Sequence, residues 1–428
     1  MKTSTCRTRF LAVVSLAMIF GATISAQMPA KEHLPGQMLS DAPPPNPTGT
    51  DPKPADATTA ILTAFDKYEV VGISAAHGNK DLDDFVLHIV RNSAFPTKVN
   101  DIVVECGNSL YQQTLDRYVA GEDVPLTEVR QVWRDTTQLM CGVSAFYEEL
   151  FPLVRRINQS VAPGKKLRVL AGDPPIDWSK VKADRDFGHG QFLMARDASI
   201  ASVMDKEVLG KHRKALMLFG TAHLFHAEST AVGIYEKNYP GVTLVIADHV
   251  GFGNWTPAEK YNNGFEARMA SWPIPSLVQQ MKGTWLLDLL DMTYSSGNIM
   301  LGVTDGGKLP AGPAKAKGTF SEVPPEALLK FSEKVDAYLY LGPRDLLLNE
   351  PTPAEIFLDK EYMAELQRRT AIMGGEPIAD QANPEKVSER DSNPFFYDPR
   401  QLDKMMQAPG GDSPLSGKDN WQQTGFRA

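Results

Sequence analysis

Short stretches that are apolar throughout recur along the middle of the chain, and helical patterns separate them. Residues 69–74 (EVVGIS) are the first such stretch, and the apolar positions between Leu82 and Val90 that follow it are spaced three or four residues apart. That spacing places apolar side chains along one face of a helix, whereas an unbroken apolar run is typical of a strand buried on both faces. The other strand-like runs are residues 101–105, 167–173, 215–220, 243–248 and 335–342.

Strands that are buried on both faces and separated by helices predict one fold class. We expect an α/β protein with a mainly parallel central sheet that is flanked by helices. In such a sheet the active-site cleft lies at the carboxyl ends of the strands. Further helices are expected at residues 109–119, 127–139, 145–158 and 191–209.

The two ends of the chain differ from this middle part in composition. Residues 1–26 combine a basic start, an apolar segment and small residues, which is typical of a secretory signal peptide. Residues 27–56 contain eight prolines and few large apolar residues, which predicts an extended linker. We expect residues 57–374 to form the α/β domain, and residues 375–428, rich in Pro, Gly, Asp and Asn, to form a poorly ordered tail.

Removal of the signal peptide makes the chain more acidic. Lys2, Arg7 and Arg9 leave with it and no acidic residue does, so the formal net charge goes from −8 to −11. A negative surface is not attracted to nucleic acid or to an anionic membrane. We therefore expect an exported protein, periplasmic or secreted, that binds neither nucleic acid nor a membrane. The sequence leaves the oligomeric state open.

Two cysteines, Cys106 and Cys141, remain after the signal peptide. An oxidising compartment permits a disulfide between them. Two free buried thiols fit the sequence equally well, because sequence alone does not set the distance between two cysteines. Neither has the electropositive surroundings of a nucleophilic cysteine, since Cys106 directly follows Glu105.

Polar residues gather where the expected strands end. His77 follows the first strand, Glu105 ends the second and Asp173 ends the third. His223 and His226 follow the fourth strand and are three residues apart, a spacing that places two side chains on one helix face. Because the carboxyl ends of parallel strands meet at one edge of a sheet, we expect these side chains to share one cleft.

Histidine and glutamate in this arrangement allow two kinds of catalysis. The chain has no G-x-S-x-G nucleophile elbow, no H-E-x-x-H zinc motif and no glycine-rich phosphate loop. In one design, which needs no cofactor, a histidine acts as general base on water while other histidines stabilise the oxyanion. In the other, a divalent metal activates the water and is bound by His77, Glu105, His223 and His226.

Each of these residues also has a plainer explanation. A single histidine after a strand is usually a turn residue or a partly buried hydrogen-bonding group. Arg196 beside Asp197 fits an ordinary ion pair on a helix surface. Glu105 is the strongest indication of a site, because a carboxylate that closes an apolar strand is rarely buried without a partner or a task. We interpret Asp248 and His249 as structural.

The order of these motifs resembles the erythromycin esterase-like family, in the superfamily that includes the haem-uptake protein ChaN and the Tiki proteases. ISAAHG matches the strand that leads to the family's histidine, and DIVVECG matches the strand that ends in its glutamate. The family's tryptophan-bearing helix is matched by VRQVWRDT. A helix and a strand that ends in Gly-Asp are matched by VRRIN and LRVLAGD. An Arg-Asp helix is matched by RDASIA, and a His-x-x-His element is matched by GTAHLFH. The resemblance covers roughly residues 60–250.

The resemblance implies an α/β fold and a small-molecule substrate, an ester such as a macrolide lactone, which is hydrolysed by a histidine-activated water. By this likeness His77 would be the base, and Glu105 would position it or the water. His223 and His226 would contact the reacting carbonyl or the base.

The resemblance also implies a substrate-binding set, which consists of Ser74, Arg196 and Asp197. The family has a glutamate three residues before its histidine, where this chain has Ser74. A serine supplies no charge to raise the basicity of an imidazole, so the expectation is a water-activating hydrolase rather than a macrolide esterase in particular. The superfamily leaves two other functions open, a metal-dependent hydrolase or peptidase of the Tiki type and a non-catalytic protein that binds haem or another ligand, as in the ChaN branch.

Overall fold

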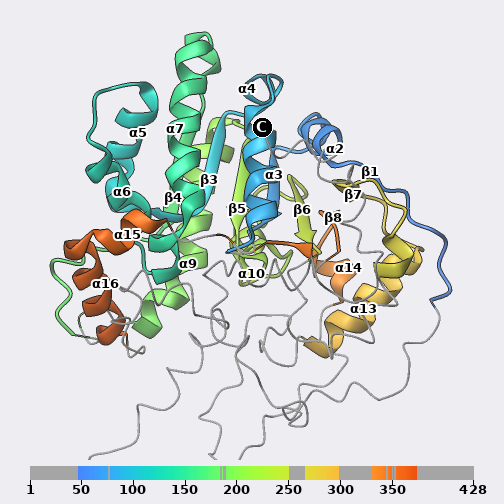
Figure 1. Cartoon of the computed structure of the whole chain (residues 1–428). Coiled ribbons are helices and arrows are strands. Elements are labelled where there is room, and N and C mark those ends of the chain that lie inside the picture. The colour runs from blue at the N-terminus through green and yellow to red at the C-terminus, as the bar shows by residue number, and fades with distance from the viewer. Residues whose placement is uncertain are drawn as a thin grey trace, which may run out of the picture.

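Eight strands form one sheet in the computed structural model, which describes residues 47–75, 78–183, 186, 189–249, 266–297, 330–343, 346–348, 350 and 353–373. The strand order is β1-β7-β8-β6-β2-β5-β3-β4 (Figure 1). The strands are β1 (Ala55–Asp56), β2 (Val70–Ser74), β3 (Asp101–Asn108), β4 (Arg168–Asp173), β5 (Ala215–Phe219), β6 (Thr243–Asp248), β7 (Ser276–Val278) and β8 (Ala337–Tyr340).

The strands from β8 to β4 in this order run parallel to one another, and β7 pairs antiparallel with both β8 and β1. These six parallel strands are the six that the apolar runs predict. Their side chains are almost all buried, as strands covered on both faces require. The predicted α/β class with a mainly parallel sheet is therefore confirmed.

Helices cover both faces of the sheet and bury a separate core on each (Figure 1). The apolar stripe between Leu82 and Val90 faces the first core, and Asn79 caps its helix by accepting hydrogen bonds from the backbone N–H groups of Asp81 and Leu82. On this face lie α2 (Ala57–Ala64), α3 (Lys80–Arg91), α4 (Phe95–Lys98), α5 (Gln112–Ala120), α6 (Leu126–Arg134) and α7 (Ala145–Ser160). On the other lie α9 (His189–Val203), α10 (Thr221–Leu224), α11 (Ala231–Glu236), α13 (Trp285–Gly297) and α14 (Phe331–Lys334).

The alternation of side chains along β3 determines which face each residue of the site reaches. Val104 and Cys106 belong to the core under α3 and α7, whereas Val103 belongs to the core under α9. Glu105, in phase with Val103, therefore points toward α9. A third group of helices, α15 (Ala354–Leu358) and α16 (Lys360–Ile372), packs around a small cluster of its own.

The structure adds to the predicted domain limits. Residues 55–56, which we expected in the linker, form β1 and pair with residues 276–277 of β7, so the folded part begins before Ala57. Cys106 and Cys141 form a disulfide, the first of the two arrangements that the sequence left open. The expected signal peptide and the expected tail lie outside the described residues. Among the described helices, none combines the length and the apolar character needed to cross a membrane.

Candidate functional site

A buried arginine joins the ends of β3 and β4. Arg196 of α9 is only 5% exposed. Its Nε donates to Asp173 Oδ1 at 2.7 Å, and its Nη2 donates to Glu105 Oε1 at 2.8 Å. Burial lowers the pKa of Arg196, but the charges of Glu105 and Asp173 outweigh burial, so its pKa is raised and the guanidinium stays charged.

Both carboxylates that bind Arg196 are also fixed from their other side. Glu105 Oε2 accepts a hydrogen bond from the Gly220 N–H, directly after β5, at 2.5 Å. Asp173 Oδ2 accepts from the Oγ1 of Thr137 at 2.8 Å and from its N–H at 3.2 Å. Each carboxylate is thus held through both oxygens, which gives a rigid polar network rather than a mobile cluster of charges.

His223 forms the partly exposed edge of this network. Its Nδ1 lies 3.0 Å from Asp197 Oδ1, and its Nε2 lies 3.2 Å from Arg196 Nη1 and 3.6 Å from Glu105 Oε1. The His223 side chain is 17% exposed, against 4% for Glu105. Burial lowers the pKa of His223, but the hydrogen bond with Asp197 and the charge of Glu105 outweigh it, so the pKa is raised above 6.5. His223 therefore binds its proton more tightly than a free imidazole does, at the partly exposed edge of the network.

The interpretation of Arg196 and Asp197 as a helix-surface ion pair is wrong. Arg196 binds the buried carboxylates, while Asp197 Oδ1 contacts His223 and also accepts from the Ala231 N–H at 2.7 Å. Their expected role in substrate binding also changes for Arg196, because its side chain has almost no exposed surface left. We assign Arg196 to positioning, and Asp197 to the orientation of His223.

A cavity opens beside this network, at the carboxyl ends of β2 and β3. Leu82, Val86 and Phe146 contribute to its apolar wall, and the Cys106–Cys141 disulfide borders it. Ser74 also lines the cavity and shares a short hydrogen bond with the Oγ1 of Thr221. The cavity thus lies on the α3 side of the strand ends, and Cys106, which lines it, directly follows Glu105 of the Arg196 network.

Two carboxyl groups, those of Asp83 and Glu350, line the same cavity. Burial raises the pKa of Asp83 well above its ordinary value, and the nearby charge of Glu350 raises it further. Glu350 Oε1 accepts from the Phe146 N–H at 2.6 Å and from the Ser144 hydroxyl at 3.0 Å, and it thereby caps the first turn of α7. The Glu350 N–H in turn donates to the Gly78 carbonyl at 2.7 Å, on the loop that follows His77.

The structure does not bring His226 to this network, so the expectation that His226 shares the cleft is wrong. Its Nδ1 lies 2.8 Å from Glu236 Oε2 and its Nε2 lies 2.9 Å from Asp336 Oδ2, just before β8. The reason is local, because α10 ends at Leu224 and Phe225 is extended, so the helical spacing between the two histidines does not hold. Burial lowers the pKa of His226, but its two carboxylate partners raise it to about 10.

His77, the expected base, lies outside the described residues. The expected metal set included His77, and the described part of the chain holds no group of three or more His, Cys, Asp or Glu side chains placed for a metal. The sequence pointed to Glu105, Asp173 and His223 through their places at strand ends. It gave no signal for Thr137 or Glu350, whose partners are distant in sequence.

No family model and no curated relative matches this sequence. Among solved structures, a protein from Bacillus cereus is similar at 10% identity and a TM-score of 0.38, over 71% of this chain and 95% of that one. A succinoglycan biosynthesis protein is similar at 9% identity and a TM-score of 0.39, over 69% and 94%. The haem-binding ChaN of Campylobacter jejuni is similar at 11% identity and a TM-score of 0.28, over 45% and 86%. Likenesses at this level concern the fold alone.

Proposed function

We propose that the chain is an exported hydrolase in which a histidine-activated water attacks an ester or a related carbonyl group. One observation carries the proposal. The buried Arg196 joins Glu105 and Asp173 at the carboxyl ends of β3 and β4, and it contacts His223 at the partly exposed edge. Charges that are fixed before the reaction stabilise a developing oxyanion without reorganising, which is a large source of catalysis.

Strand pairing supports the placement of the base beside this network. β2 pairs in parallel with β5, with Ser74 opposite Phe219. His77 follows Ser74 by three residues, and His223 follows Phe219 by four. The segments that lead to the two histidines therefore begin at neighbouring strand ends, on the same edge of the sheet.

The proposed reaction assigns each group a step. The His77 imidazole accepts a proton from water as the water oxygen adds to the carbonyl carbon. The positive charge of Arg196, together with His223 at the partly exposed edge, would stabilise the oxygen that becomes negative. When the intermediate collapses, the His77 imidazolium returns the proton to the departing alcohol, and the carboxylic acid remains. The apolar wall of the cavity would bind the apolar part of the ester.

A substrate panel with paired histidine variants tests the proposal. Chromogenic esters and peptides are incubated with the protein with and without a chelator. We expect ester turnover that the chelator leaves intact and that His223→Gln lowers by about 10²–10³-fold in kcat/KM. His226→Gln is the matched control, since it removes the other histidine of the same motif, and it should retain the rate per folded molecule.

Two results would contradict the proposal. Absence of ester hydrolysis across the whole substrate panel would contradict the proposed hydrolase function. Turnover that the chelator abolishes and that zinc restores would replace it with the metal-dependent hydrolase or peptidase that the sequence left open.

A further inference from the structure

We propose that Arg369 of α16, the last of the described helices, is a positioning residue for the site. It fixes the loop that anchors Asp173, and it thereby sets the place of the Arg196 guanidinium. The inference rests on the hydrolytic function proposed above. Arg369 itself contacts neither Glu105 nor His223 in the described structure, so it acts through the residues between them.

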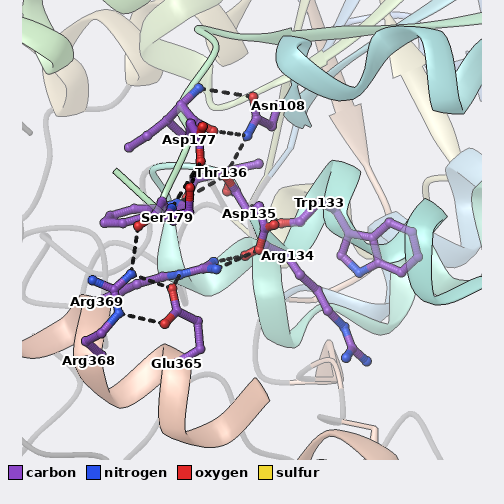
Figure 2. Close-up of polar contacts among 12 residues, drawn as sticks. Asn108, Trp133, Arg134, Asp135, Thr136, Asp177, Ser179, Glu365, Arg368 and Arg369 are labelled. Atoms are coloured by element: carbon purple, nitrogen blue, oxygen red, sulfur yellow. Dashed lines mark hydrogen bonds and ion pairs between the residues drawn. The ribbon is translucent and has the colours of Figure 1, made fainter. Parts of the chain in front are cut away.

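The first link joins α16 to the loop after α6 (Figure 2). Arg369 Nη1 donates to the Arg134 carbonyl at 2.8 Å, and Nη2 donates to Asp135 Oδ1 at 2.7 Å. The Arg369 side chain is 4% exposed, and its guanidinium carbon lies 5.0 Å from the centroid of the Trp178 ring. A planar guanidinium that is bonded at two edges and stacked on a ring has one orientation, so it fixes the loop in direction as well as in distance.

The second link joins that loop to the segment after β4. Trp178 Nε1 donates to the carbonyls of Asp135 and Thr136, each at 3.1 Å. Asn108, at the end of β3, donates through Nδ2 to the carbonyls of Asp135 and Ile176, each at 2.8 Å. The loop is therefore tied to the ends of both strands whose carboxylates bind Arg196, as Figure 2 shows for Asn108.

The third link reaches the site itself. Thr137, two residues after Asp135, donates through Oγ1 and N–H to Asp173 Oδ2. Asp173 Oδ1 accepts from Arg196 Nε, and Arg196 in turn contacts Glu105 and His223. A shift of Asp173 would rotate the Arg196 plane against both partners, and small displacements of catalytic groups lower rates strongly.

The neighbouring Arg368 allows a positioning role of Arg369 to be distinguished from a role in merely attaching α16 to the rest of the protein. Arg368 donates to the carbonyls of Trp178 at 2.9 Å and Val181 at 2.6 Å. Both arginines also bind Glu365, so each attaches the helix to the same body. The described hydrogen bonds of Arg368 do not reach residues 134–137, whereas those of Arg369 do.

The test compares Arg369→Met with Arg368→Met as the matched control. Both variants remove one positive charge and the hydrogen bonds of one guanidinium from the same helix. We expect Arg369→Met to lower kcat by about tenfold with little change in KM, because substrate contacts remain while the site loses its geometry. Arg368→Met should retain kcat, although it also loosens the attachment of α16.

A second readout does not depend on turnover. The pKa of His223, followed by NMR of histidine-labelled protein, should rise in Arg369→Met, because the Arg196 charge that lowers this pKa moves away. Thr137→Val removes the hydroxyl link alone at nearly constant size, and it should raise the same pKa while α16 stays in place. If Arg369→Met does not fold, an unchanged His223 pKa in Thr137→Val would still break the series of contacts that the proposal needs.

The outcomes test the positioning role of Arg369 and the proposed hydrolase function separately. An unchanged His223 pKa in folded Arg369→Met, or in Thr137→Val, would overturn the positioning role. Equal loss of kcat in both arginine variants would also overturn it, because docking of α16 would then explain the effect. Absence of turnover in the unmodified protein would contradict the proposed hydrolase, while the NMR comparison would still test the chain of contacts.

Discussion

Arg196 determines how charge is arranged at the strand ends. The sequence showed this residue within a short motif, but its buried position and its two carboxylate partners depend on the packing of α9 against the sheet. Glu105 and His223 were predictable, because Glu105 closes one apolar run of the sequence and His223 comes shortly after another. The sequence reasoning wrongly placed His226 in the cleft. It assumed helical spacing between His223 and His226, but α10 has only four residues and ends at Leu224.

Replacing Arg196 by methionine tests how much the network contributes to the stability of the protein. Arg196→Met leaves Glu105 and Asp173 buried without their shared cation, which typically costs about 3–5 kcal/mol. Urea unfolding followed by circular dichroism measures the change. Arg91→Met is the control, because its ion pair with Glu149 is half-exposed and should matter little. A variant as stable as the unmodified protein would show that the buried carboxylates do not need Arg196.

His226 predicts a specific dependence of stability on pH. Its pKa is raised from 6.5 to about 10 in the folded protein, so the folded state binds its proton more tightly than the unfolded state does. The stabilisation is therefore complete below pH 6.5 and is lost as the pH rises through about 10. The difference in unfolding free energy between the unmodified protein and His226→Gln should shrink over this range. A difference that stays constant would contradict the two carboxylate contacts.

At the scale of the elements, the six parallel strands were predictable and the two antiparallel ones were not. The parallel strands are long apolar runs, because both of their faces are buried. β1 and β7 have only two and three residues, and they lie at the edge of the sheet next to one another. Segments this short carry no periodicity that separates a strand from a loop.

The disulfide between β3 and the segment before α7 gives a prediction at the scale of the elements. It joins Cys106 and Cys141, which are 35 residues apart in sequence. The loop-entropy model gives about 3–4 kcal/mol for a loop of this length. Cys106→Ala combined with Cys141→Ala should lower the unfolding free energy by this order, measured against the oxidised protein. Two titratable thiols in the unreduced, denatured protein would contradict the bond itself.

At the scale of the whole molecule, the candidate site is assembled from segments that are far apart in the chain. Glu105, Asp173 and His223 come from three strand ends, and Glu350 reaches the same edge from beyond β8. A parallel sheet brings its strand ends together, so the general location followed from the fold class. The supporting contacts of Thr137, Glu350 and Arg369 could not be predicted, because they depend on how separate loops pack.

The central claim is that the histidine after β2 and the Arg196 network form one hydrolytic site. Its most direct test is the steady-state rate of ester hydrolysis by His77→Ala, beside the control His88→Ala, which removes a histidine from the last turn of α3. The account predicts that kcat/KM falls by about 10²–10⁴-fold in His77→Ala at an unchanged melting temperature, and that His88→Ala keeps its activity. Full activity in folded His77→Ala would contradict the account, because water would then be activated without the proposed base.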